Sequence, residues 1–356
     1  MSKKVLYPVI ALVVIVAILV ISENMKKKAP SEAEMLFFPN LKENSVESIL
    51  IEKTGEKIKL RKKGDGWIVS QPSSATEEKE SEAAASPLGS GDAAAATAEP
   101  VTTAKEYPVD SASITAAIEK ITSMKKDILV SENTEKQSLF EVDTAKGILV
   151  TLEDNSGKKI GSFIIGKSGA DYSSNYIRLM GSNSVYMVSG GVRSALFTDL
   201  KRWRDKNIMK FDKATAKGIT LAKSDGSLIT LAKSDSGNPW EILQPIKNPA
   251  KTDAVDGILD KLAKLNATDF QDEILPDTAM GFDKPELGVT VSFDNGSSRN
   301  LIFGKKNKDN KYWVKTDGKK QIYLISEYYF NQINKKLEDL KGEPMVKPIA
   351  SDSTKK

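Results

Sequence analysis

The chain has no cysteine and no histidine among its 356 residues. Without cysteine it has no disulfide, no thiolate metal ligand, no cysteine nucleophile and no lipidated cysteine as a membrane anchor. Without histidine it has no imidazole metal ligand and no histidine-dependent catalytic triad. These two absences exclude most of the common catalytic machinery, and we therefore expect neither an enzyme nor a cofactor.

An excess of charge of one sign is also lacking. The 52 lysines and arginines are nearly balanced by 48 aspartates and glutamates, which leaves a formal net charge of +4. A nucleic-acid-binding protein gathers basic residues much more strongly, so we expect no nucleic-acid partner. The length favours two domains of roughly 100 to 150 residues each, joined by linkers.

Long hydrophobic runs are rare, but one is present, from Val5 to Ile21, and its 17 residues carry no charge. As a helix the run would extend about 26 Å, close to the roughly 30 Å hydrocarbon core of a bilayer. The alternatives are a cleaved signal peptide and a buried helix of a soluble domain. Three lysines at 26–28 follow the run in place of a small-residue cleavage site, so we predict a retained transmembrane anchor within residues 1–28.

The charges that flank this run are nearly balanced, with Lys3 and Lys4 before it and Lys26 to Lys28 after it. The positive-inside rule therefore gives little guidance on orientation. A short tail followed at once by an apolar run is typical of signal anchors for exported domains. We predict that the N-terminus stays inside and that most of the chain is translocated.

The remainder of the chain contains an internal repeat. Residues 46–72 combine two runs rich in strand-forming residues, a Thr54-Gly55 turn and a tryptophan strand that ends in Gln71-Pro72. Residues 218–245 repeat this order, with an Asp225-Gly226 turn and a tryptophan strand that ends in Gln244-Pro245. Both segments predict a β-hairpin or meander.

A helix is predicted after each meander, because apolar residues recur at helical spacing. Those residues are Ile114, Ala117, Ile118 and Ile121 in one copy, and Val255, Ile258, Leu259 and Leu262 in the other. Ser111 and Thr252 are the candidate N-caps. Three further strands are expected in each copy, at 148–152, 163–165 and 186–188, and at 289–293, 301–303 and 323–325. Each copy then closes with an amphipathic helix, at 192–203 and at 329–340.

These patterns predict an α+β fold in which an N-terminal transmembrane helix precedes two tandem repeats, each an antiparallel sheet covered by one or two helices. The first repeat extends over residues 36–210 and the second over 211–341. Residues 73–106 form an insert rich in Ala, Ser, Glu, Gly and Pro, which predicts a disordered loop in the first repeat. We also predict disorder for the tail at 342–356.

Several of these features together resemble the bacterial family known as domain of unknown function 4340, across nearly all of residues 36–341. They are the anchor, the Phe38-Pro39 pair, the strand from Trp67 to Pro72, the turn from Phe282 to Pro285, the strand ends at Gly166 and Gly304, and Arg204-Asp205-Lys206. Ala145 stands where the family pattern has proline. The resemblance implies an accessory or scaffold partner of a gliding-motility-type ABC exporter, located in the bacterial inner membrane.

One motif suggests a nucleotide site, because residues 161–168 match the phosphate-binding pattern G-x-x-x-x-G-K-[ST]. That chemistry needs a glycine-rich loop between a strand and a helix. Here the middle positions are Ser-Phe-Ile-Ile, which favour a strand, and the equivalent Gly304-Lys305-Lys306 lacks the hydroxyl residue. We interpret Gly166-Lys167 as a turn at the end of a strand.

Acidic residues recur near strand ends, at Asp143, Asp154, Asp283 and Asp294. Paired carboxylates could serve acid/base hydrolysis or bind Ca²⁺. Their spacing matches no EF-hand loop, and Asp-Asn pairs are common in turns. We interpret them as turn residues.

The aromatic residues are expected to pack in the sheets. Trp67 and Trp240 occupy matching strands and are predicted to be buried, and Tyr176, Tyr312 and Trp313 to be half-buried. Trp203 lies between Arg202 and Arg204, immediately before the second repeat. It could join the two repeats or be exposed to a partner, and we favour the joint.

Three hypotheses about function follow. The first is a non-catalytic, membrane-anchored accessory or scaffold protein of a cell-envelope complex, with protein partners. The second is an envelope module that binds a glycan or a peptide through an exposed aromatic groove between the two repeats. The third is an unrecognised hydrolase, which requires at least two convergent carboxylates in a cleft.

Overall fold

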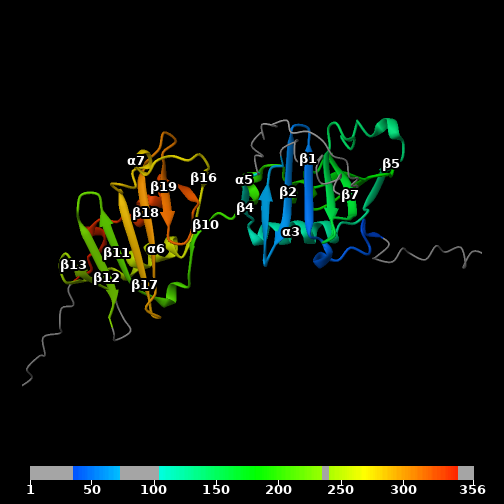
Figure 1. Ribbon diagram of the computed structural model, residues 1–356. Helices are drawn as coiled ribbons and strands as arrows, with labels where there is room; N and C mark the ends of the chain where they lie inside the picture. Colours follow the sequence, from blue (N-terminus) through cyan, green and yellow to red (C-terminus); the bar gives the residue numbers. More distant parts are fainter. Residues whose placement is uncertain (1–34, 73–103, 235–239, 344–356) are drawn as a thin grey trace, which may run out of the picture. The chain divides into compact units, whose positions relative to one another are not determined.

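The computed structural model describes residues 35–72, 104–234 and 240–343, which divide into two compact units at Asp205/Lys206. Figure 1 shows each unit as a set of strands side by side. In the described part of the chain, no helix has the length and apolar character needed to cross a bilayer. The predicted anchor at 1–28 lies outside the described residues.

Within the described residues, the first unit contains one antiparallel sheet of nine strands in the order β4-β3-β2-β1-β6-β7-β8-β9-β5. The strands are β1 (Ser48–Lys53), β2 (Glu56–Lys63), β3 (Gly66–Ser70), β4 (Glu106–Pro108), β5 (Ile128–Ser131), β6 (Ile148–Glu153), β7 (Lys159–Ser168), β8 (Asn175–Leu179) and β9 (Val185–Val188). The helices are α3 (Ser111–Thr122), α4 (Val192–Ala195) and α5 (Leu200–Trp203), with short 3₁₀ turns η1 (Glu43–Ser45) and η2 (Thr134–Lys136).

The second unit repeats this topology strand for strand, in the order β14-β13-β12-β11-β17-β18-β19-β20-β16. The strands are β11 (Ala216–Lys223), β12 (Leu228–Lys233), β13 (Trp240–Gln244), β14 (Asn248–Pro249), β16 (Asp269–Gln271), β17 (Leu287–Phe293), β18 (Ser298–Lys306), β19 (Lys311–Thr316) and β20 (Ile322–Ser326). A separate pair joins β10 (Asn207–Lys210) to β15 (Lys264–Asn266). The helices are α6 (Thr252–Leu262), α7 (Asp277–Met280), α8 (Glu327–Ile333) and α9 (Leu337–Leu340), with the 3₁₀ turn η3 (Lys213–Thr215).

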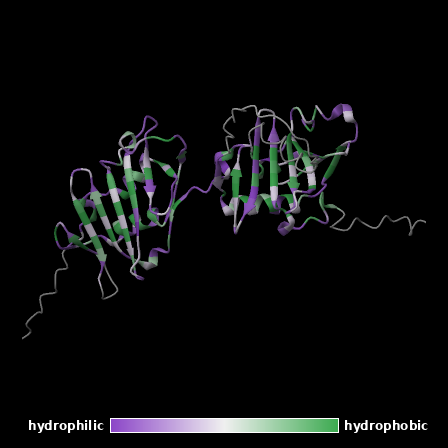
Figure 2. Ribbon diagram, in the orientation of Figure 1, coloured by the Kyte–Doolittle hydropathy of each residue, from purple (hydrophilic) through white to green (hydrophobic). Residues whose placement is uncertain are grey.

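The strands form because apolar and polar residues alternate with the two-residue period of a sheet. In β2, Ile58 and Leu60 are buried between exposed or half-buried basic neighbours. Gly55 makes the β1–β2 turn possible, because its φ of +80° is unfavourable for residues with a Cβ. Figure 2 shows the resulting stripes of hydrophobic and hydrophilic residues along the strands.

A long helix in each unit packs on the sheet. The buried residues of α3 are the four that the sequence pattern predicted, and they share a hydrophobic core with strands of the first sheet. The four predicted residues of α6 do the same in the second unit. The fold prediction of two antiparallel sheets with covering helices is therefore confirmed for the described residues.

The predicted N-caps are wrong by one residue. Asp110 caps α3, because its carboxylate accepts a hydrogen bond from the Ser113 amide at 2.8 Å, and Ser111 is the first helical residue. Lys251 occupies the cap position of α6 without a side-chain bond, and Thr252 is again the first helical residue.

The same backbone clasp closes both units. The residue before each helix donates to the end of the closing segment, from Asp110 N to Trp203 O and from Lys251 N to Leu340 O, both at 2.8 Å. Isolated bridges extend the clasp, joining Val109 to Arg204 and Ala250 to Lys341. Trp203 and Leu340 thus occupy equivalent positions, and both are fully buried.

The closing segments are not the continuous helices that the sequence predicted. Each is two short helices, α4 and α5 or α8 and α9. The break leaves backbone oxygens free of helical hydrogen bonds, and side chains donate to them. Phe197 O accepts from Trp203 Nε1 at 2.9 Å, and Lys335 O accepts from Lys223 Nζ at 2.7 Å.

Three predicted boundaries also change. Residues 207–210 belong to the second unit, because β10 pairs with β15, as Leu36 pairs with Lys125 in the first. Glu106, predicted as the end of the insert, lies in β4 and pairs with Ser70. Gly342, predicted in the tail, donates to Pro249 O at 2.7 Å. The rest of the predicted insert, 73–103, and of the tail, 344–356, lies outside the described residues.

Candidate functional site

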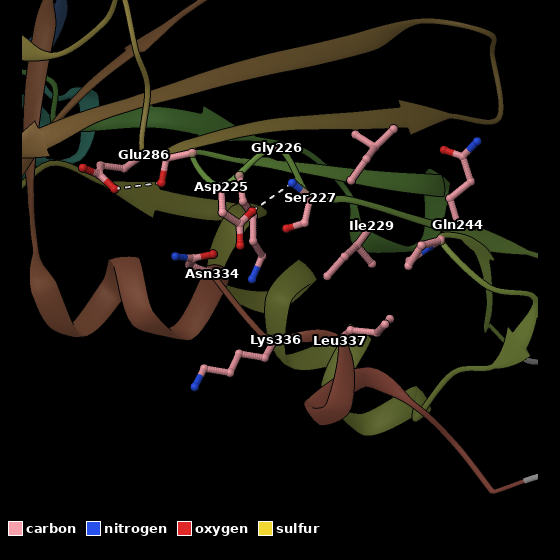
Figure 3. A pocket seen from close by; sticks show the side chains of 13 residues that line it. Asp225, Gly226, Ser227, Ile229, Gln244, Glu286, Asn334, Lys336 and Leu337 are labelled. Carbon is pink, nitrogen blue, oxygen red and sulfur yellow. Dashed lines mark hydrogen bonds between the residues drawn. The ribbon is translucent and has the colours of Figure 1, made fainter.

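A pocket of about 800 Å³ lies at one corner of the second unit (Figure 3). Its walls come from four places: the β11–β12 turn with the start of β12, the end of β13, Glu286 just before β17, and the link between α8 and α9. The Asp225-Gly226 turn and Gln244-Pro245, which mark the repeat in the sequence, therefore meet at this pocket.

Two carboxylates line the pocket, and each is held by a serine. Asp225 accepts a hydrogen bond from the Ser227 amide at 2.8 Å, and bonding to Ser227 lowers the pKa of this carboxyl. Glu286 accepts from Ser224 Oγ at 3.2 Å. Because a general acid needs a raised pKa, Asp225 is suited to remain an anion rather than to donate a proton.

Lys223 is the most buried cation of the pocket. Its ammonium donates to Lys335 O at 2.7 Å, which ties the hairpin to the α8–α9 link. Desolvation lowers the pKa of Lys223, against the opposing effect of the carboxylates of Asp225 and Asp339. Lys336, exposed at the other end of the link, brings a second positive charge to the pocket.

Asn334 contributes a buried acceptor to the pocket wall. Within the described residues, its side-chain oxygen is buried and has no hydrogen-bond partner. Such an atom costs about 1–3 kcal/mol unless a donor reaches it. Although Asn334 lines the pocket, this oxygen lies beneath the pocket surface.

Apolar groups form the rest of the lining. Ile229 is buried and Leu337 half-buried, whereas 41% of Leu228 is exposed. Apolar surface with a few fixed donors and acceptors is the usual composition of a binding site for a small molecule or a peptide. The arrangement can bind and orient a ligand.

An exposed aromatic pair lies elsewhere on the second unit. Tyr328 and Tyr329 are 61% and 37% exposed, and their rings meet edge to face with centroids 5.6 Å apart. Lys261 of α6 lies 6.0 Å from each ring centroid. The glycan-binding hypothesis requires an aromatic groove between the repeats, and this pair is an exposed aromatic surface on the second repeat alone.

The phosphate-binding pattern forms no phosphate loop. All of residues 161–168 lie in β7, with a register shift between Ile165 and Ser168. The Gly304-Lys305 pair lies in β18 at an equivalent shift. Gly166-Lys167 is therefore a bulge within a strand, and the predicted turn is wrong in this detail. Glycine is needed because a Cβ at Gly166 would collide with Phe140 O, and one at Gly304 with Met280 O.

The acidic residues of the sequence analysis lie in or near turns. Asp154 accepts hydrogen bonds from Ser156 N at 2.9 Å and Lys158 N at 3.0 Å, and Asp143 from Ala145 N and Lys146 N at 2.9 Å. Asp283 follows α7 and Asp294 precedes the Gly296 turn between β17 and β18. In the ranges that the structure describes, no three acidic side chains are grouped as a metal site would require.

The aromatic residues mostly follow their predictions. Trp240 is 2% exposed, whereas Trp67 is only half-buried against the first core. Tyr176, Tyr312 and Trp313 are half-buried in their sheets, as predicted.

Trp203 is fully buried in the core of the first unit, where it packs on Phe197 with centroids 4.3 Å apart. The guanidinium of Arg202 lies 4.1 Å from the centre of the Phe197 ring, and that of Arg204 3.6 Å from the centre of the Tyr107 ring. Trp203 is thus not exposed to a partner, and its role in a joint between the repeats stays a prediction.

Sequence reasoning missed most of the pocket. Lys223, Asn334 and Lys336 come from segments far apart in the chain, and only the turn residues were marked. One signal was present: Asn334-Lys335-Lys336 interrupts the apolar period of the predicted closing helix.

The comparisons with known proteins concern the family only. No curated protein matches the chain. The sequence profile described as Domain of unknown function (DUF4340) matches residues 100–280 and 240–343, which together cover more than half of the chain. The chain belongs to this DUF4340 family.

Proposed function

We propose that this protein is a non-catalytic, membrane-anchored accessory or scaffold protein of a cell-envelope complex, and that the pocket of the second repeat binds a segment of a partner protein. One observation carries the proposal: the pocket combines an exposed Leu228, the cation of Lys336 and the carboxylates of Asp225 and Glu286. An extended peptide offers the backbone N–H groups and apolar side chains that suit such a site.

The anchor belongs to the same proposal. The uncharged run from Val5 to Ile21 supports a single span of the bacterial inner membrane, with both repeats on the extracytoplasmic side. The family resemblance supports an ABC-type exporter as the machine to which the partner belongs. A scaffold held at the membrane meets such a partner at a high local concentration, so one modest pocket suffices for binding.

Site-specific photocrosslinking in native membranes tests this proposal. A photoreactive residue in place of Leu228 should form adducts with a membrane protein, identified by mass spectrometry as an exporter subunit. The same residue at Leu139, which is 60% exposed in the first repeat, serves as the control. Lys336→Glu should reduce the adduct several-fold, whereas Lys308→Glu, the same charge change on an exposed loop, should not. Adducts that are absent, or equal at both sites, would refute the partner-binding role.

The second candidate is a module that binds an envelope glycan or peptide, favoured by the exposed Tyr328–Tyr329 pair beside Lys261. Aromatic rings stack on sugar faces, and a nearby cation adds affinity for acidic groups. Full-length protein in detergent should then bind cell-wall fragments, and Tyr328→Ala should weaken binding at least several-fold. Tyr172→Ala, at a 90% exposed tyrosine of the first repeat, is the matched control.

Hydrolysis is the least supported function. Asp225 and Glu286 do share the pocket, but bonding to Ser227 lowers the pKa of Asp225. A hydrolase of this type needs one carboxylic acid with a raised pKa beside one carboxylate. An envelope hydrolase activity that disappears in both Asp225→Asn and Glu286→Gln, with folding intact, would overturn the non-catalytic proposal.

A further inference from the structure

Three large apolar side chains are exposed at the mouth of the pocket in the second repeat. Leu228 is 41% exposed and lines the pocket. Leu243 and Ile246 are each 45% exposed and flank Gln244-Pro245, which also lines it. Leu228 and Ile246 lie beyond the last residue pair of β12 with β13, at the same end of the two strands. We call these three side chains the apolar rim.

The equivalent residues of the first repeat are polar. Lys57 pairs with Glu52 in the first sheet as Leu228 pairs with Ala222 in the second. By their distance from the Gln-Pro pair, the equivalents of Leu243 and Ile246 are Ser70 and Ser73. Single exposed apolar residues are normal on a protein surface, whereas a group of them marks an interaction site. Because the same sheet forms without these residues, the apolar rim is available for binding.

Two carboxylates lie beside this rim. Asp225 is in the turn that leads to Leu228, and Glu286 stands just before β17, the strand that pairs with β11. Each carboxylate accepts a hydrogen bond from a serine, but in the part of the chain that the structure describes neither forms a salt bridge. The ammonium of Lys223 is directed to Lys335 O at 2.7 Å. The two carboxylates can therefore pair with a cation from a ligand.

These charges are also specific to the second repeat. The β1–β2 turn is Thr54-Gly55, and Gly147 stands before β6 where Glu286 stands before β17. Lys336 comes from a different wall, because it lies on the link between α8 and α9 (Figure 3). The pocket thus has an acidic wall on the sheet, next to the apolar rim, and a cation on the helical link.

We propose that the partner segment bound here is an apolar stretch with one basic residue, whose side chain pairs with Asp225 and Glu286 while the apolar side chains cover the rim. Lys336 donates to a backbone carbonyl of the segment from the other wall. The opposite charges of the two walls fix the direction of the segment, and the rim supplies apolar contact. The inference rests on the proposed binding of a partner segment in this pocket and adds the chemistry of that segment.

The photocrosslink at Leu228 identifies the segment directly. The adduct is digested with a protease that does not cut at basic residues, and mass spectrometry should find a lysine or arginine near the crosslinked position, among apolar neighbours. A crosslinked stretch of a membrane protein that is acidic, or that has no basic residue, would overturn this inference and leave the proposed function intact. The absence of any adduct would contradict the proposed function itself.

Synthetic peptides test the charge preference on the full-length chain in nanodiscs of zwitterionic lipid. The probes are labelled leucine-rich peptides that differ only in a central lysine, glutamine or glutamate, and fluorescence anisotropy measures their affinity, with empty nanodiscs as the blank. The lysine peptide should bind several-fold more tightly than the glutamate peptide, and added salt should reduce the difference. Equal affinities, a tighter glutamate peptide or no binding of any peptide would overturn the inference.

Variants separate the acidic wall from the apolar rim. Glu286→Lys should reverse the preference in favour of the glutamate peptide, a gain that loss of folding cannot produce. Leu243→Ser and Ile246→Ser should weaken every peptide several-fold and keep the preference. Ile274→Ser, at a 96% exposed side chain between β16 and α7, is the control and should have no effect. A lysine preference that survives both Asp225→Asn and Glu286→Gln would overturn the role of the acidic wall.

Discussion

The two repeats share one sheet order, one helix position and one backbone clasp, but they differ in the residues placed on this frame. In the first repeat the outer strand β5 exposes Ile128 and Leu129, and at the corner equivalent to the pocket Gln71-Pro72 leads into residues 73–103. In the second repeat Phe270 of the outer strand β16 is buried, and the pocket forms at that corner. The comparison separates positions that the fold requires, which recur, from positions free to serve binding, which do not.

The largest expected effects concern the clasp. Trp203→Ala should destabilise the first repeat by about 3–5 kcal/mol and Leu340→Ala the second by about 2–5 kcal/mol, because both side chains are fully buried. Hydrogen exchange with mass spectrometry of the full-length chain assigns each loss to a repeat. Each variant should weaken its own repeat only. Equal loss in both repeats would show that the repeats unfold as one unit.

Arg178 and Lys315 occupy equivalent strand positions, opposite Ile164 and Ile302 respectively, but they differ in burial and in bonding. Arg178 is 8% exposed and donates to Val142 O at 2.9 Å and Ser182 O at 3.0 Å, whereas Lys315 bonds the largely exposed Asp277 at 2.8 Å.

Arg178→Met should therefore cost about 1–3 kcal/mol through unpaired buried carbonyls, and Lys315→Met about 0–1 kcal/mol. Urea unfolding of each variant measures the two losses. Equal losses would contradict the difference in burial.

The bulge glycines are positions that the fold requires in both copies. Gly166→Ala and Gly304→Ala should each cost roughly 1–3 kcal/mol, because the added methyl group meets a backbone oxygen that cannot move away easily. Gly66→Ala is the control, since its Cβ would meet nothing within 4 Å, and it should change stability by less than about 0.5 kcal/mol. The same unfolding measurement applies. A neutral Gly166→Ala would refute the close approach of the Phe140 segment.

The features that recur locally in the sequence could be predicted from it. The hairpins, the tryptophan strands and the buried faces of α3 and α6 follow from spacing over a few residues, and the structure confirms them. The short strands β5 and β16 could not be predicted, since they are stabilised by β9 and β20, more than fifty residues later in the chain.

The pocket escaped prediction for the same reason. Lys223 bonds Lys335 O across 112 residues, and no local pattern indicates that contact. The breaks in the closing helices could not be predicted either, because the side chains that donate to the freed carbonyls are not indicated by the helical period. The prediction for Gly166-Lys167 was wrong for a different reason, because a glycine inside a strand was interpreted as the end of that strand.

The smallest expected effect is a difference in pH dependence between the β7–β8 connection and the β18–β19 connection. In the first, Asp171 accepts hydrogen bonds from Ser174 N at 2.9 Å and Ser174 Oγ at 2.7 Å, which lowers the pKa of Asp171 to about 2. In the second, Asn307 accepts from Asp309 N and Lys311 N at 2.9 Å and carries no titratable group.

Because the pKa of Asp171 is lower in the folded chain than its usual value near 3.9, the stabilisation by its carboxylate is complete above that value and is lost as the pH falls through 2. NMR of the amide of Ser174 should therefore show loosening near pH 2, while the amide of Lys311 shows no such midpoint. Asp171→Asn should make the first connection behave like the second, with no midpoint in this range. A midpoint near pH 4 at Ser174 would mean that the hydrogen bonds to Asp171 do not hold the turn in solution, and the two connections would then differ in sequence alone.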